Sequence, residues 1–151
     1  MIIAETESLI RDNDIPLPRA KFRRQSEGED PTVLADIYLE ETNIVIWRRK
    51  LPATFSQSIE SFLDLNSELQ VAMVVTPETA YSLIHEKLAD SGQHELCKNI
   101  DQLVGMFCSL LEVQRVGLRL ANLDRAMCPK FHVDKVPCRM VTTFQGLATE
   151  W

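Results

Sequence analysis

The sequence predicts an α+β fold in which N-terminal amphipathic helices pack on a β-sheet. Apolar residues recur with the 3.6-residue helical period in several segments in the middle of the chain, and with the two-residue period of a strand from Val116 onward. Short β-branched runs at 43–47 and 69–75 are typical of buried strands. We expect residues 1–30 to form an irregular N-terminal arm and residues 31–151 to form a single α+β domain.

Composition limits the class of protein. The chain has 151 residues, a formal net charge of -6 and 45% hydrophobic residues, which fits a folded domain with a core. An acidic protein has no long-range attraction for phosphate backbones, and the basic triplet Arg48-Arg49-Lys50 is typical of a solvated strand end. No apolar run approaches the length of about 18 residues that a membrane span needs. We therefore expect no nucleic-acid partner and no membrane partner.

The N-terminus and the cysteines indicate a cytoplasmic protein. Met1–Ala4 runs directly into Glu5 and Glu7, rather than forming the basic and apolar regions of a signal peptide. The four cysteines form no C-x-x-C pair, and free thiols are the default in a reducing compartment. Two of the four, Cys97 and Cys108, lie in a helical pattern and are expected in or near the core.

The first elements follow an arm rich in charge and broken by Pro16 and Pro18. Asp30-Pro31 supplies a helix N-cap followed by proline at the first helical position, and predicts a short helix that ends near Thr42. The apolar run Asn43–Trp47 then predicts a strand that is covered on both faces.

Three further helices and another strand are predicted between residues 52 and 111. The first helix follows Pro52, with Thr54 or Ser56 as its cap, and Leu69–Val75 returns to a strand. Thr76-Pro77-Glu78 has the composition of a helix start, and Ser91-Gly92 separates that helix from a longer one. The apolar stripes of the three helices are Phe55, Ile59, Phe62 and Leu63; Ala80, Leu83, Ile84 and Leu88; and Leu96, Ile100, Leu103, Val104, Phe107, Leu110 and Leu111.

The period changes toward two after Glu112. Val116, Leu118 and Leu120 alternate with Gly117, Arg119 and Ala121, which predicts a strand with Arg119 on the face opposite to the apolar residues. After a loop, two short strands are predicted at 131–134 and 138–144, separated by Pro137.

The strongest candidate for chemistry is the pair His132 and Asp134. Residues two apart in a strand point to the same face, so an imidazole nitrogen and a carboxylate oxygen would converge there. An H-x-D pair supplies two of the three ligands in the two-His-one-carboxylate triad that binds Fe(II). The alternative is a histidine that is merely ion-paired with its neighbouring aspartate.

A second interpretation of this region uses sulfur. Cys128, His132, Asp134 and Cys138 together would offer ligands that suit a tetrahedral Zn²⁺ site, although the spacing matches no strong zinc motif. The other histidines, His85 and His94, lie in helical patterns and are expected to be solvated or structural. No zincin, P-loop, α/β-hydrolase or Rossmann motif is present in the sequence.

Several anchors in order resemble a bacterial family, the domain-of-unknown-function family eighteen-twenty-six. They are Val116-Gly-Leu-Arg-Leu, then Cys128-Pro-Lys-Phe-His-Val-Asp-Lys-Val-Pro-Cys-Arg139, then Thr142-Thr-Phe-Gln-Gly146 and Thr149-Glu-Trp151. The run Asn43-Ile-Val-Ile-Trp-Arg-Arg49 also resembles the family's early strand, so the resemblance covers roughly residues 40–151.

That family is similar to Fe(II)/2-oxoglutarate oxygenases. The resemblance implies a partial double-stranded β-helix, a jelly-roll-like sheet, with Fe(II) and 2-oxoglutarate as cofactors and an unknown small molecule or protein as substrate. His132 and Asp134 would be metal ligands, with Cys128 as an additional candidate. Arg139 and Arg119 are candidates for substrate contact or for structural salt bridges.

This chain departs from the family pattern in two places. It reads Gly146-Leu147-Ala148-Thr149 where the family usually has a second glycine, and family members continue past the position of Trp151. We therefore expect either an oxygenase-like metal-binding domain, a non-enzymatic zinc-binding or interaction protein of the same fold, or an inactive fragment truncated at its C-terminus. An unclosed sheet exposes unpaired strand edges, which predicts a homodimer through the C-terminal strands.

Overall fold

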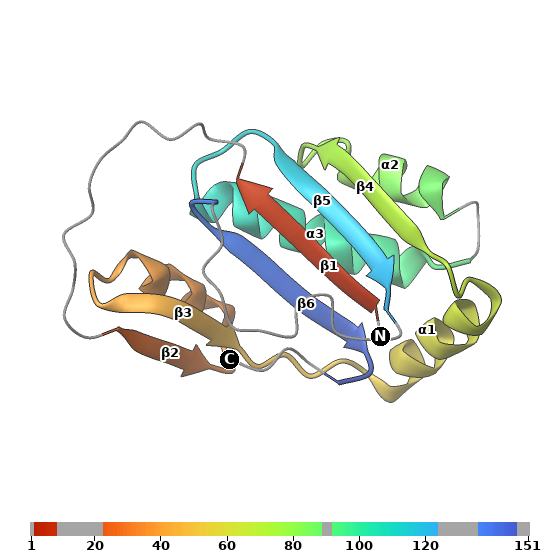
Figure 1. The fold of residues 1–151 in the computed structure, drawn as a ribbon, viewed down its shortest axis with the longest axis horizontal. Helices are drawn as coiled ribbons and strands as arrows, with labels where there is room; N and C mark the ends of the chain where they lie inside the picture. The colour runs from red at the N-terminus through yellow and green to blue at the C-terminus, as the bar shows by residue number, and fades with distance from the viewer. Residues whose placement is uncertain (1, 9–22, 89–91, 124–135, 148–151) are drawn as a thin grey trace. The chain divides into compact units, whose positions relative to one another are not determined.

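The computed structural model describes residues 23–88, 92–123 and 136–147, together with the backbone of residues 2–8. The chain folds into two compact units (Figure 1). The first unit contains Met1–Arg11 and Pro52–Trp151, and the second contains Asp12–Leu51. The two units are described separately below.

A four-stranded antiparallel sheet forms the centre of the first unit. Its strands are β1 (Ile2–Ser8), β4 (Gln70–Val75), β5 (Val116–Asn122) and β6 (Arg139–Gln145), in the order β4-β5-β1-β6. Strand β1 lies between β5 and β6 and pairs with both of them along its length, as Figure 1 shows.

The strand β1 differs from the irregular arm expected for residues 1–30. A further strand, β2 (Arg24–Gly28), also lies in that range. The physical reason is that both neighbours of β1 are distant in sequence: Ile2 pairs with Asn122 of β5 and with Gln145 of β6. Backbone pairing of this kind leaves no periodic apolar signal in the strand itself, so a charged, sparsely apolar sequence can still form a central strand.

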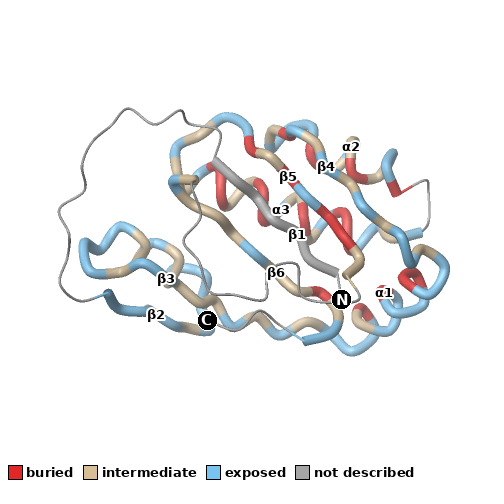
Figure 2. The backbone as a smooth tube through the Cα atoms, in the orientation of Figure 1, coloured by how far each residue is buried: buried red, intermediate tan, exposed pale blue. Residues whose placement is uncertain are grey.

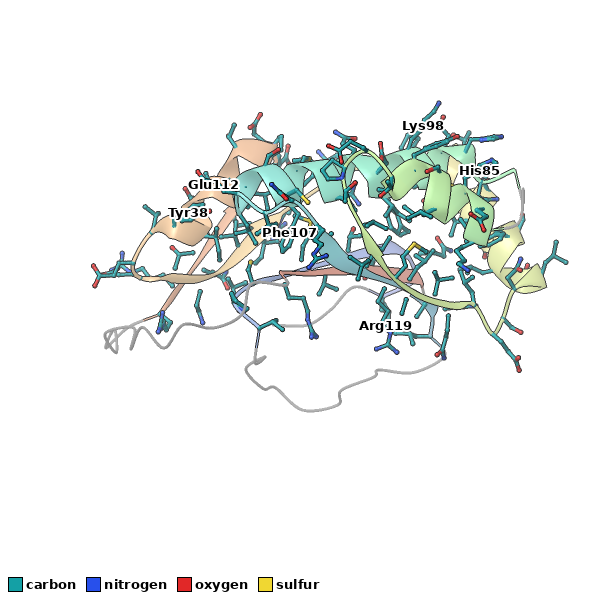
Figure 3. All side chains as sticks on the ribbon, turned by 90° about the horizontal axis from the view of Figure 1, so that it is seen from above. Tyr38, His85, Lys98, Phe107, Glu112 and Arg119 are labelled. Carbon is teal, nitrogen blue, oxygen red and sulfur yellow. The ribbon has the colours of Figure 1, made fainter. Side chains whose placement is uncertain are left out.

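Three helices cover one face of this sheet, as Figures 1 and 3 both show. They are α1 (Ala53–Leu65), α2 (Ala80–Lys87) and α3 (His94–Leu110). The buried residues of α1 are the four predicted from its apolar stripe, Phe55, Ile59, Phe62 and Leu63. Helix α3 buries most of its predicted stripe together with both cysteines, whereas Leu110 and Leu111 at its end are only half-buried.

The core of the first unit lies between the helices and the sheet (Figure 2). Along β5, Val116, Leu118 and Leu120 are buried and Arg119 is exposed, as the two-residue period predicts, but Ala121, on the same face as Arg119, is also buried. The aromatic ring of Phe55 meets that of Phe144 edge-on, with centroids 6.1 Å apart, which ties α1 to β6. The largest fully buried side chains are Phe107, Ile59, Ile84, Leu96, Ile100, Leu120, Val75, Val104, Val116 and Cys97.

The helix starts differ from the sequence expectation by a few residues. Helix α1 has its N-cap at Pro52 and no side-chain cap, so Thr54 and Ser56 lie inside its first turn. Helix α2 begins at Ala80 rather than at Thr76-Pro77-Glu78, which forms a preceding turn in which the backbone N–H of Thr76 donates to Oγ1 of Thr79 at 3.0 Å. The backbone N–H of Ala80 donates to the carbonyl of Thr76 at 2.9 Å, so this turn leads directly into the helix.

The second unit contains a parallel strand pair and a short helix. Strand β2 pairs with β3 (Thr42–Trp47), and they are joined through the 3-10 helix η1 (Pro31–Tyr38). The predicted N-cap is confirmed, because Oδ1 of Asp30 accepts a hydrogen bond from the backbone N–H of Thr32 at 2.9 Å. The strand β3 has no buried residue among those described, whereas the sequence predicted that it is covered on both faces.

The predicted α+β class is confirmed. A double-stranded β-helix is not shown: the strands in the described part of the chain form one four-stranded sheet and one two-stranded pair. A β-helix of that type needs a second sheet that faces the first.

Candidate functional site

The predicted metal ligands fall outside the described residues. His132, Asp134 and Cys128 all lie in the segment 124–135, so their convergence stays a prediction. Within the residues that the structure does describe, no group of three or more His, Cys, Asp or Glu side chains is arranged to hold a metal ion.

The strands on either side of that segment are well defined. Strands β5 and β6 are both antiparallel to β1, so they run parallel to each other. The last residue of β5, Asn122, pairs with Ile2, and the first residue of β6, Arg139, pairs with Glu7, near the other end of β1. Parallel strands need a crossover connection of a dozen or more residues rather than a tight turn. Residues 123–138 make that connection, which explains the long interval between two strands of one sheet.

The end of β5 is anchored to the loop that follows α1. The backbone N–H of Asn122 donates to the carbonyl of Leu69 at 2.8 Å, and its side-chain amide donates to the carbonyl of Asn66 at 3.5 Å. The side-chain amide of Asn66 donates in turn to the carbonyl of Phe62 in α1 at 2.8 Å. This chain of contacts fixes the point from which the segment with His132 and Asp134 departs.

The two candidate arginines occupy positions on the same face of the sheet. Arg119 pairs in register with Glu5 of β1, and Arg139 pairs with Glu7. Because residues two apart in a strand share a face, both arginines lie on the face opposite to the helices. Figure 3 shows Arg119 on that face. Arg119 is exposed, whereas Arg139 is half-buried.

The described cysteines are free thiols. Burial raises the pKa of Cys97 and Cys108, both of which face the core from α3. Burial also raises the pKa of the half-buried Cys138, which directly precedes β6, and this outweighs a hydrogen bond from the backbone of Arg139. A raised pKa favours the neutral thiol, which is neither a good nucleophile nor a metal ligand until it loses its proton.

One polar cluster joins α2 and α3. The ring of His85 stacks on the ring of Tyr81, with centroids 5.8 Å apart, and on the ring of His94, with centroids 5.0 Å apart. The hydroxyl of Tyr81 lies 3.1 Å from Nδ1 of His94. The backbone N–H of Tyr81 donates to Oδ1 of Asp101 in α3 at 3.1 Å. His85 and His94, which belong to different helices, are therefore neighbours in the fold.

Helical spacing alone accounts for one pair in this cluster, Tyr81 and His85. Tyr81 and His85 are four residues apart and so share a face of α2. The position of His94 depends on how the chain turns between the two helices, which no local pattern encodes. The cluster contains two imidazoles and a phenol, and the described residues bring no third metal-ligating group to it. Its contacts identify it as a clamp between two helices.

A comparison with protein families finds a match over most of the chain. The family model described as a protein of unknown function (DUF1826) matches residues 28–151. No curated protein and no solved structure matches the chain. The helices that the structure describes include none that is both long and apolar enough to cross a membrane.

Proposed function

The chain belongs to the DUF1826 family of proteins of unknown function, and we propose that it is a metal-binding domain of the Fe(II)/2-oxoglutarate oxygenase type. The observation that carries the proposal is the spacing of His132 and Asp134, in the segment that joins β5 to β6. The finer fold in this proposal is a double-stranded β-helix of which the observed sheet is one part.

The donor types suit the proposed metal. An imidazole and a carboxylate are two of the three protein ligands in the facial triad of non-haem Fe(II) oxygenases, which leaves positions for O₂ and a co-substrate. Arg119 and Arg139 lie on one face of the sheet and would offer guanidinium groups to the carboxylates of 2-oxoglutarate. A structural role for Arg139, which is half-buried, is the alternative.

The proposed reaction is oxidative decarboxylation coupled to hydroxylation. 2-Oxoglutarate and O₂ would be converted to succinate and CO₂, while one oxygen atom is inserted into a C–H bond of an unknown small molecule or protein. The iron would activate O₂; the chain would hold the metal and orient the co-substrate. The two electrons removed from 2-oxoglutarate and the two removed from the substrate together reduce one O₂.

The test measures iron binding and succinate release by the purified chain under air. We expect iron-dependent succinate release, lost in His132→Ala and in Asp134→Ala, with iron affinity at least about 10-fold weaker, because even outer partners of metal ligands cost 10- to 100-fold when removed. His85→Ala is the matched control, since His85 belongs to the clamp between α2 and α3. Iron affinity that is unchanged in both ligand variants would overturn the proposal, as would a metal-loaded protein that releases no succinate.

A non-enzymatic zinc protein is the second candidate, because Cys138 is a free, half-buried thiol close to the proposed ligands in sequence. Cys128, His132, Asp134 and Cys138 would then complete a tetrahedral site. Metal analysis separates the two candidates. Loss of bound zinc in Cys128→Ala and Cys138→Ala supports the zinc site, whereas loss of metal only in His132→Ala and Asp134→Ala supports the iron site.

Two broader proposals accompany this function. The chain would act in the cytoplasm, where the thiols of Cys97, Cys108 and Cys138 stay reduced. A homodimer through the C-terminal strands is supported by the position of β6 at one edge of the four-stranded sheet. Light scattering of the purified chain tests the second proposal, and a monomer at all concentrations would contradict it.

A further inference from the structure

The strand β4 forms the other edge of the four-stranded sheet. It pairs with β5 from Gln70 to Val75 without a shift in register, and among the residues that the structure describes no strand pairs with its outer side. Figure 1 shows β4 at the end of the sheet. An edge strand presents unpaired backbone groups, which are a template for pairing with another strand.

The register identifies which backbone groups point outward. The N–H of Asn122 donates to the carbonyl of Leu69 at 2.8 Å, and extension of the β4–β5 register places these two residues opposite each other. Hydrogen-bonded pairs recur every second residue in an antiparallel ladder, so Val71, Met73 and Val75 bond to β5. The N–H and C=O groups of the alternate residues, Gln70, Ala72 and Val74, therefore point to the outer side.

The strand β4 lacks the devices that usually protect an edge. Its sequence, Gln70-Val-Ala-Met-Val-Val75, has no charged residue and no proline, and its ladder has no bulge. The side chains of Gln70, Ala72 and Val74 are exposed, Val74 to 54%. The opposite edge differs, because the pairing of β1 with β6 shifts register between Ile2 and Ile3, and Arg139 begins β6.

We propose that β4 pairs antiparallel with β4 of a second copy of the chain, about a two-fold axis at Ala72. This register opposes Ala72 with its own copy and Gln70 with Val74 of the other copy, so that all three outward residues form hydrogen-bonded pairs. A second copy fits because the pairing is self-complementary: an uncharged strand places no like charges opposite each other, and a two-fold axis satisfies both edges at once.

The same pairing accounts for the incomplete burial of side chains on the helix side of β4. Val71 and Met73 are only half-buried although they face the helices. The proposed register sets Val71 opposite Met73 of the other copy, which would cover both apolar side chains. Two paired strands of six residues bury less surface than a standard stable interface. The dimer is therefore expected to depend on concentration.

The test is sedimentation velocity of the full chain over a range of micromolar concentrations. We expect a dimer for the unchanged protein, and at least about 10-fold weaker dimerisation for Ala72→Lys and for Ala72→Glu, because each opposes like charges across the axis. An equimolar mixture of the two variants is expected to restore the dimer, since lysine then faces glutamate. A mixture that stays monomeric would overturn the two-fold register.

The controls use the same substitution at the two edges of the sheet. Val74→Lys in β4 is expected to weaken the dimer, because a lysine on an edge strand disfavours pairing with another strand. Val141→Lys in β6, also exposed and on the same face, is expected to leave the β4 contact intact, whereas it would weaken a dimer formed through the C-terminal strands. Circular dichroism checks that each variant folds, and Val74→Lys replaces the Ala72 variants should these fail to fold. A monomer at every concentration overturns the proposal, and so does a dimer lost only in Val141→Lys, which would assign the contact to β6. The outcome is independent of iron binding and succinate release.

Discussion

The hydroxyl of Tyr81 and Nδ1 of His94 lie 3.1 Å apart and join the helices α2 and α3. His85 adds a ring that stacks on both partners. The two helices also meet where the backbone N–H of Tyr81 donates to Asp101. His85 follows Ile84 in one helical pattern and His94 lies near the start of the next, so their role as a clamp depends on how the two helices pack against each other.

Tyr81→Phe removes the hydroxyl and keeps the stacked ring. We expect the free energy of unfolding to fall by about 0.5–1.5 kcal/mol, the usual net value of one hydrogen bond, with the lower end favoured because His94 is exposed. Urea unfolding measures the change. In a double-mutant cycle with His94→Ala, a coupling energy near zero would show that the hydrogen bond contributes nothing to stability.

Two leucines in α1 test the assignment of its buried face. Leu63 is 8% exposed and Leu65 is 87% exposed, and they lie two residues apart. Leu63→Ala is expected to cost about 2–5 kcal/mol of unfolding free energy, because it leaves a cavity in the core. Leu65→Ala is expected to change stability by less than about 0.5 kcal/mol. Equal effects of the two substitutions would contradict the observed orientation of α1.

The two arginines on the sheet face opposite to the helices are expected to differ. Arg139→Ala should lower the free energy of unfolding by about 1 kcal/mol or more, because a half-buried arginine also packs through its methylene groups. Arg119→Ala should stay within about 0.5 kcal/mol, because Arg119 is exposed. Thermal unfolding measures both. If 2-oxoglutarate stabilises the unchanged protein against heat and no longer does so in Arg119→Ala, Arg119 contacts the co-substrate.

The buried thiols of α3 predict a loss of stability in alkali. Burial raises the pKa of Cys97 and Cys108 above the ordinary value of 9.0, so the folded chain holds these protons to higher pH than the unfolded chain does. Their contribution to stability is present below about pH 9 and is lost as the pH rises through the folded pKa. Urea unfolding between pH 8 and about pH 10 should therefore show a smaller decline for Cys108→Ala than for the unchanged protein. An identical slope would contradict the assignment.

The sequence predicted the parts of the fold that depend on local periodicity. The stripe Phe55, Ile59, Phe62 and Leu63 faces the core, and the alternation around Arg119 gives a strand that buries Val116, Leu118 and Leu120 on its helix side. Both patterns are readable because burial on one side of an element repeats along the chain at the period of that element. The helix starts were less accurate, because a few hydrogen bonds, such as those of the turn between Thr76 and Thr79, set the end of an element and no repeating pattern marks it.

The candidate metal ligands illustrate how far sequence reasoning extends toward function. The spacing of His132 and Asp134 and the family's motif both come from the sequence, and they support a metal site as a proposal. The described structure contributes the strands on either side, β5 and β6, and the two arginines on one face. The iron-binding experiment tests whether the side chains of His132 and Asp134 bind one metal ion together.

The sequence by itself determined the amphipathic faces of α1 and α3 and the cap at Asp30, because each is encoded in residues close together along the chain. It also determined the membership of the family, which matches over residues 28–151. Only the tertiary structure placed β1 between β5 and β6 and brought His85 against His94. Those arrangements depend on backbone pairing between distant parts of the sequence and on the packing of one helix against another. The pairing of β1 gains its free energy only after the chain has closed a long loop, and the contact of His85 with His94 depends on the turn between α2 and α3, so no local pattern predicts either of them.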